Sequence, residues 1–411
     1  MAEAVYVLGA GFSCSMLDTS FRDLRAPLAR NFFEVLLRHG RLREKLDGIR
    51  RHVYVDELFA MINEYWGLSI DQLAATPFDI EECLTFLESV EMDNRGTDEG
   101  IRAARAAYAT RALLLDYLSE MSIGGTTTPA GYQFGVEVLG SDCDVLTLNY
   151  DTLAEDAIAS ASGIGPNPRP PPLSVDDPSA AVADEFLPAS HSAWKRTLAC
   201  GFEFDEVALP VAGVSRYVEG SRYYEHSENC LYTSHRVLKL HGSIDWLRYT
   251  SRRAIPREFA VDAPENPPTG LVQERYAHWW MGESPQRDHW YMDPLIVTPQ
   301  LYKKYDDEPL PTVWRHALDT LSSCTSLVVI GYSFPPTDFR TRRLFLEAFR
   351  GGRQLESLVV INPDTSVVSK VRELTRHNGP VVTCDTLAAY IGLPESWVRG
   401  LQQASHQDGP T

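Results

Sequence analysis

Short apolar runs recur along the chain, and each is followed by glycine or by a polar residue. Runs of this length that are rich in valine, leucine and isoleucine predict strands buried on both faces of a sheet. The predicted strands cover 4–8, 144–149, 236–242, 295–299, 326–331, 357–362 and 380–384.

Helical periodicity fills much of the chain between these strands. Residues 24–122 have a helical character, most clearly in 101–121, where strong helix formers carry apolar residues at helical spacing. Further helices are predicted at 151–160, 311–323, 337–350 and 365–377. The last third therefore alternates strand and helix, which predicts an α/β fold with a parallel sheet and right-handed crossovers.

Two stretches interrupt this alternation. Residues 161–235 include a proline-rich loop at 163–178, and residues 250–292 contain three tryptophans. A length of 411 residues fits one large domain with insertions, or two domains. We predict a single domain over residues 1–395, carrying the helical region and both insertions, followed by a C-terminal tail at 396–411.

The balance of charge and the cysteine pattern exclude several classes of protein. Lys and Arg number 38 against 56 Asp and Glu, a net charge of −18, so the chain is a poor unaided binder of nucleic acid or anionic membrane. It has neither a secretory signal pattern nor 18 consecutive apolar residues. Its seven cysteines form no C-x-x-C pair, which argues against a disulfide framework and a four-cysteine zinc site. We expect a cytoplasmic protein with reduced thiols and no metal.

Small, polar or ionisable residues follow five of the predicted strands. Ligands of open parallel sheets bind at the carboxyl ends of the strands. Each segment alone has a structural explanation, such as a turn, a helix cap, a core histidine or a charge at a helix start. Together they predict one ligand site, and they are Gly9-Ala10-Gly11-Phe12-Ser13, Asn149-Tyr150-Asp151, His241-Gly242-Ser243, Gly331-Tyr332-Ser333 and Asn362-Pro363-Asp364.

In order and spacing, these segments resemble the sirtuin family, and more closely its bacterial sirtuin-like branch of NAD-degrading defence proteins. The resemblance extends over residues 5–364. It pairs the family's G-A-G-x-S loop with 9–13, its N-x-D with 149–151, its H-G with 241–242 and its G-x-S with 331–333. Phe21-Arg22 matches the family's F-R dipeptide, and Asn362 matches its ribose-binding asparagine.

The resemblance implies a Rossmann-like parallel sheet that binds NAD as a substrate. Asn149 would orient the attacking water, His241 would act as general base, and Asp151 would hold the nicotinamide carboxamide or orient Asn149. Phe21 would cover the reactive face of the ribose. The implied NAD-binding residues are Gly9, Ala10, Gly11, Phe12, Ser13, Phe21, Arg22, Gly331, Ser333 and Asn362, with Asp364 a weaker candidate for the ribose.

Three departures from the family bear on the reaction. Ser20 stands where sirtuins carry an acidic residue before F-R. The structural zinc module of deacetylating sirtuins needs four cysteines, and residues 243–330 contain only Cys324. The segment that clamps an acyl-lysine peptide is not recognisable. The resemblance therefore implies an NAD hydrolase that releases nicotinamide and ADP-ribose, with an NAD-dependent protein deacylase and a nucleotide-sensing module without turnover as alternatives.

The same branch implies a biological setting. Its members act in antiphage defence by depleting NAD, as oligomers or with a partner such as a HerA-type ATPase. We therefore expect a homo-oligomer or a defence partner, with no direct binding of nucleic acid or membrane. Trp279, Trp280, Trp290 and Tyr291 are the candidate contact residues, because large aromatic side chains are favoured at interfaces.

Overall fold

The fold is described by a computed structural model that covers 2–16, 26–38, 54–124, 128–161, 200–211, 214–221, 235–250, 268–274, 286–287 and 290–392. Contacts between residues divide the chain into two compact units. Unit 1 comprises Met1–Leu17, Thr126–Gly242 and Tyr305–Thr411, and unit 2 comprises Asp18–Gly125 and Ser243–Lys304. The sequence predicts one domain over residues 1–395, whereas the contacts group the helical region with the second insertion. The predicted tail at 396–411 lies outside the described residues.

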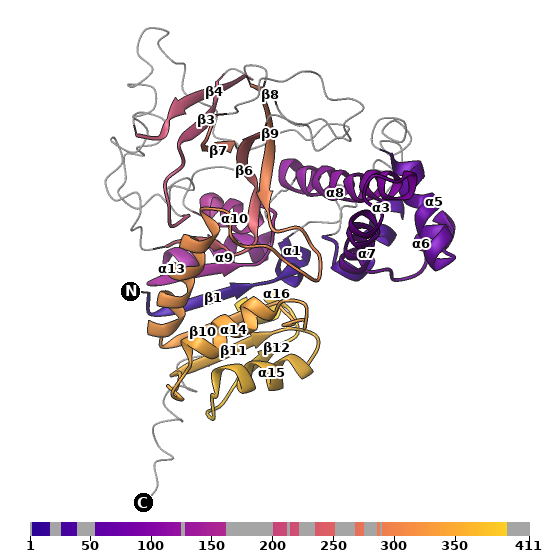
Figure 1. The fold of residues 1–411 in the computed structure, drawn as a ribbon. Coiled ribbons are helices and arrows are strands. Elements are labelled where there is room, and N and C mark those ends of the chain that lie inside the picture. Colours follow the sequence, from indigo (N-terminus) through magenta and orange to yellow (C-terminus); the bar gives the residue numbers. More distant parts are fainter. Residues whose placement is uncertain are drawn as a thin grey trace, which may run out of the picture. The chain divides into compact units, whose positions relative to one another are not determined.

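Unit 1 contains a six-stranded parallel sheet in the order β12-β11-β10-β1-β2-β5 (Figure 1). From the centre of the sheet, β1, β2 and β5 follow one another toward one edge, and β10, β11 and β12 follow one another toward the other edge. This is the strand order of Rossmann folds. The predicted Rossmann-like parallel sheet is therefore confirmed. The strands are β1 (Ala4–Leu8), β2 (Cys143–Thr147), β5 (Val237–Lys239), β10 (Ser326–Ile330), β11 (Ser357–Ile361) and β12 (Val382–Cys384).

The strands of this sheet are apolar because helices cover them. Val5, Val7 and Leu8 of β1 are fully buried, and β2 is buried along its whole length. The helices fall into two groups with internal contacts, as expected for layers on the two faces of a parallel sheet. One group is α1 (Ala10–Met16), α9 (Pro129–Leu139), α10 (Leu153–Ala161) and α16 (Leu387–Ile391); the other is α13 (Leu310–Ser323), α14 (Phe339–Ala348) and α15 (Ser366–Thr375).

Two predicted strands differ from the observed ones by more than two residues at an end. The strand expected at 236–242 is wrong in length, because β5 ends at Lys239. The next two residues, Leu240 and His241, form a turn, and β6 (Gly242–Thr250) begins after it. Gly242 permits this turn with a positive φ of 77°. The strand expected at 295–299 is the end of β9 (Trp290–Ile296), which pairs antiparallel with β8 (Gln286–Arg287) and is not part of the parallel sheet.

Unit 2 contains the helical region. The described parts of 24–122 are mainly helical, as predicted, and α8 packs against both α5 and α7. The helices are η1 (Ala29–Asn31), α3 (Phe32–Arg38), α5 (Val55–Trp66), α6 (Ile70–Leu73), α7 (Ile80–Asp93) and α8 (Asp98–Gly124). The unit also holds β6, β8, β9 and β7 (Leu271–Glu274), with β6 and β7 antiparallel. In unit 1, within the first predicted insertion, β3 (Glu206–Val211) and β4 (Val214–Glu219) form an antiparallel pair.

Candidate functional site at the carboxyl edge of the parallel sheet

The loops after β1 and β10 pack directly against each other. The Gly11 N–H donates to the Gly331 carbonyl at 3.0 Å, and the Gly9 N–H donates to the Ile330 carbonyl at 2.9 Å. Gly331 has a positive φ of 62°, and a Cβ on it would lie 2.5 Å from Gly11 Cα. These glycines thus allow two backbones to meet at the point where the strand order reverses, which is where Rossmann folds bind their ligands. Their N–H groups are engaged within the protein.

Asn149 is held in a single orientation at this edge. Its amide nitrogen Nδ2 donates to the Gly9 carbonyl and to Ser13 Oγ, both at 2.9 Å. The Gly9 carbonyl can only accept, so the Nδ2 side of the amide must face it. Asn149 is 9% exposed. Both amide hydrogens are therefore used inside the protein, and the side chain offers a ligand its carbonyl oxygen Oδ1, which is an acceptor.

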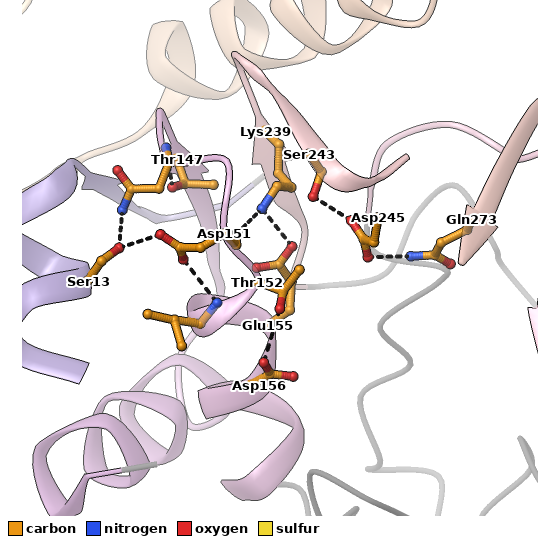
Figure 2. Close-up of polar contacts among 12 residues, drawn as sticks. Ser13, Thr147, Asp151, Thr152, Glu155, Asp156, Lys239, Ser243, Asp245 and Gln273 are labelled. Atoms are coloured by element: carbon orange, nitrogen blue, oxygen red, sulfur yellow. Dashed lines mark hydrogen bonds and ion pairs between the residues drawn. The ribbon is translucent and has the colours of Figure 1, made fainter. Parts of the chain in front are cut away.

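Asp151 is fixed by the same network. Its Oδ2 accepts from Ser13 Oγ at 2.7 Å, and its Oδ1 accepts from the Leu153 N–H at the start of α10 at 3.1 Å. Ser13 thus links Asn149 to Asp151, as Figure 2 shows for Ser13 and Asp151. The carboxylate is 6% exposed and both of its oxygens have protein partners. Of the two roles that the sequence left open, this geometry supports the orienting one.

A buried cation supports the loop from the neighbouring strand. Lys239 of β5 is fully buried, and its Nζ donates to the Asp151 main-chain carbonyl and pairs with Glu155 Oε1 at 3.1 Å (Figure 2). Glu155 is itself buried in α10. The ion pair therefore connects β5, the loop after β2 and α10.

His241 lies two residues after Lys239, in the turn after β5. It is 4% exposed, and its Nε2 is 3.3 Å from the Tyr305 hydroxyl and 3.7 Å from Asp338 Oδ1. The Tyr150 ring lies 6.0 Å from the imidazole, measured between centroids, at a tilt of 30°. Because β2 and β5 are parallel neighbours, Asn149 and His241 emerge from adjacent strands at the same edge of the sheet.

Asp338 carries a second contact. Its Oδ2 accepts from the Tyr332 hydroxyl at 2.9 Å, and both side chains are buried. Burial, reinforced by the negative charge of Asp338, raises the pKa of Tyr332 well above its usual value. Tyr332 therefore remains a hydroxyl donor, and the carboxylate of Asp338 is its acceptor.

The other predicted site residues fall into three groups. Phe12 is buried and its ring packs on Phe134 at 4.8 Å, so its side chain belongs to the core, while Ala10 is half-buried at the start of α1. Ser333 is exposed, and Asn362 is half-buried with its amide donating to the Tyr332 carbonyl at 3.4 Å. Phe21 and Arg22 lie outside the described residues, as does Ser20.

Lys239, Tyr305 and Asp338 were not among the residues selected from the sequence. A lone lysine within the apolar run 236–242 signals a buried ion pair, because a charge in a covered strand requires a partner. Asp338 has the appearance of an ordinary helix cap, and nothing local distinguishes Tyr305. In the part of the chain that the structure describes, no three His, Cys, Asp or Glu side chains could together hold a metal ion, and no helix is long and apolar enough to cross a bilayer.

Comparison with known proteins gives a partial structural likeness. No family model matches the sequence, and no curated protein matches it. Among solved structures, a Sir2 homologue in complex with NAD is 14% identical, with a TM-score of 0.40, covering 98% of this chain and 91% of that one. A Sir2 homologue variant in complex with ADP-ribose is 15% identical, with a TM-score of 0.35, covering 100% and 96%. Both TM-scores lie below 0.5, and the fold described above rests on this chain's own strand order.

Proposed function

We propose that this chain binds NAD at the carboxyl edge of the unit 1 sheet and hydrolyses the bond between nicotinamide and ribose. The observation that carries the proposal is the fixed amide of Asn149, whose only uncommitted group among the described residues is an acceptor oxygen. An acceptor held at this edge can take a hydrogen from a water molecule or from a ribose hydroxyl. The general base then comes from the neighbouring strand as His241.

In the proposed reaction, the C–N bond to nicotinamide breaks and the electron pair leaves with nicotinamide. The ribose passes through an oxocarbenium-like state, and a water oxygen bonds to its anomeric carbon. His241 accepts the proton that the water loses, so NAD⁺ and water yield nicotinamide, ADP-ribose and a proton. Asn149 orients the water, and Asp151 acts through Ser13 by keeping Asn149 in place. No step requires a metal, so we expect EDTA to leave the rate unchanged.

The loops after β1, β10 and β11 would hold the rest of NAD. Their meeting point is where the strand order reverses, which favours a dinucleotide there. We propose that Ala10 and Ser13 lie nearest the diphosphate, with Gly331 and Ser333 on the facing loop and Asn362 toward the adenosine ribose. The glycines at 9 and 11 contribute by allowing the loops to pack closely. Phe21 and Arg22 remain candidates for the nicotinamide side of the site.

The test is to incubate the purified full chain with NAD, without any acylated peptide, and to identify the products by mass spectrometry. Equal amounts of nicotinamide and ADP-ribose are expected. Release of nicotinamide only in the presence of an acyl-lysine peptide would favour a deacylase instead. Binding of NAD without any product would favour a nucleotide-sensing module, and a cyclic product would mean that water is not the nucleophile.

We also propose that the chain acts in antiphage defence, where loss of NAD halts an infected cell, and that assembly or a partner controls it. The support is the resemblance of its motifs to sirtuin-like defence proteins. A physical argument points the same way, because an unregulated NAD hydrolase would damage the cell that makes it. A homo-oligomer and a HerA-type ATPase are the controlling assemblies that this resemblance suggests.

A further inference from the structure

We propose that Asp338 is a positioning residue that keeps the proton of neutral His241 on Nε2, so that Nδ1 is the basic nitrogen. The geometry is independent of any ligand, whereas the benefit to catalysis rests on the function proposed above. Four buried side chains of unit 1 carry the inference: His241, Tyr305, Tyr332 and Asp338.

The first observation is that Asp338 does not act as the helix cap that its position suggests. It occupies the N-cap of α14, where an aspartate ordinarily accepts a hydrogen bond from the first turn. Here its side chain makes no such bond, and its backbone departs from the usual extended conformation, with φ −92° and ψ 53°. The carboxylate is buried and directed to Tyr332 and His241. A residue that gives up a favourable local contact often does so for a functional one.

The second observation is that the two carboxylate oxygens of Asp338 have different partners. Tyr332 donates to Oδ2 at 2.9 Å and stays protonated, since burial raises its pKa. Oδ1 lies 3.7 Å from His241 Nε2, too far for a hydrogen bond but within ion-pair range. In a site this buried, a negative charge at that distance stabilises an N–H dipole that points toward it. Nε2 is therefore the nitrogen that carries the proton.

Tyr305 fits the same arrangement. Its hydroxyl oxygen is 3.3 Å from Nε2 and can accept from an Nε2–H. The Tyr305 ring is also covered by Arg340, whose Cζ is 4.5 Å from the ring centroid. The titratable groups that the described contacts place around the imidazole are thus Tyr150, Tyr305 and Asp338. Asp338 supplies the anion among these three groups, and its position beside Nε2 favours a proton on that nitrogen.

The consequence for catalysis follows from the tautomer. With the proton on Nε2, the lone pair of neutral His241 is on Nδ1, and that nitrogen is the one able to accept a proton from water or a ribose hydroxyl. A carboxylate that fixes the tautomer and then stabilises the imidazolium is a known means of supporting a histidine base. Asp338 would play this role from α14 without contacting substrate.

The experiment records long-range proton–nitrogen correlation spectra of the full chain, without NAD, at mildly alkaline pH. The His241 signals are assigned by their loss in His241→Gln. We expect Nε2 to be protonated in the wild type. In Asp338→Asn, the Tyr332 hydroxyl should still donate to the side-chain oxygen, which turns the NH₂ group toward Nε2. Because a donor then faces Nε2, that nitrogen should carry the lone pair and the proton should move to Nδ1. Tyr305→Phe, which keeps the carboxylate, should retain the wild-type tautomer.

Asp319→Asn is the matched control, since Asp319 is an exposed aspartate on α13. A wild-type proton on Nδ1 would overturn the proposal, and this result does not depend on whether Asp338→Asn folds. A tautomer unchanged by Asp338→Asn, or changed more by Tyr305→Phe, would overturn it too. If NAD is cleaved, kcat should fall about tenfold or more in Asp338→Asn with KM nearly unchanged. If NAD is not cleaved, the proposed function fails while the spectra still test the role of Asp338.

Discussion

At the scale of single residues, Lys239 links β5 to the loop after β2 and to α10. Its charge is fully buried and is compensated by Glu155 and by the Asp151 carbonyl. Taking a charge out of water is costly, and a paired charge becomes strongly destabilising when its partner is removed. The intact pair thus adds little net stability, whereas loss of either partner leaves an uncompensated buried charge.

We expect Lys239→Met to lower the free energy of unfolding by about 3–5 kcal/mol, because Glu155 would keep a buried carboxylate without its cation. The double variant Lys239→Met/Glu155→Gln should recover part of that loss, and urea unfolding of both single variants and the double variant measures the coupling. Additive effects would show that the two side chains do not act as a pair. Arg102→Met, which removes an exposed pair with Glu64, should cost less than about 1 kcal/mol.

The candidate site was predictable from the sequence where its chemistry is local to a strand end. Asn149, Asp151 and His241 each follow an apolar run, and the structure brings all three to one edge of the sheet. Tyr305 and Asp338 were not predictable, because their contact with His241 is a product of folding; Tyr305 lies 64 residues from His241 along the chain. The link from Asp151 to Asn149 through Ser13 was not predictable either, since it depends on hydrogen bonds formed in the folded chain.

At the scale of elements, the strands and helices predicted after residue 310 match their observed positions to within a few residues. At β2, a side chain competes with the sheet and shifts the end of the strand. β2 ends at Thr147, whose Oγ1 accepts from the Asn149 N–H at 3.1 Å, so the loop starts earlier than the apolar pattern suggests. β5 ends early for a different reason, since the chain turns at Leu240 and His241 before β6.

The first residue of β2 gives a pH prediction at this scale. Burial raises the pKa of the Cys143 thiol from 9.0 to about 12. Above pH 9 the unfolded chain releases this proton while the folded chain retains it, so the free energy of unfolding falls with rising pH. Urea unfolding at pH 8 and at pH 10.5 measures how far the free energy of unfolding falls between the two pH values. This fall should be about 2 kcal/mol smaller in Cys143→Ala than in the wild type.

A buried neighbour provides the control for this titration. Val145→Ala removes apolar volume from the same strand without removing an ionisable group. It should lower stability equally at both pH values. If Cys143→Ala shows the same pH dependence as the wild type, the thiol does not contribute to alkaline destabilisation.

At the scale of the whole molecule, the division into two units could not be predicted from the pattern of apolar and polar residues. The chain leaves unit 1 after Leu17, returns at Thr126, leaves again after Gly242 and returns at Tyr305. Periodicity identifies which segments are helices or strands, but it does not say which of them pack together. That choice depends on matching apolar faces, which no single segment reveals.

The proposed control by assembly is testable at this scale. We expect the purified chain alone to cleave NAD slowly, and the rate to rise at least about tenfold in the active assembly, a shift of about 1.4 kcal/mol in the population of the competent state. Size-exclusion chromatography with light scattering, coupled to an NAD assay across protein concentrations and with an added partner, measures this. A monomer with a full rate that neither concentration nor partner changes would contradict it.

The central claim is tested most directly by the rate of nicotinamide release from NAD, measured by mass spectrometry for the wild type and for Asn149→Ala. The account predicts one nicotinamide and one ADP-ribose per NAD in the wild type, and a rate reduced by about 10²–10⁴ in the variant. Asn378→Ala, which alters an exposed asparagine, should retain the wild-type rate. A folded Asn149→Ala protein that keeps more than about a tenth of the wild-type rate, a loss below about 1.4 kcal/mol, would contradict the account.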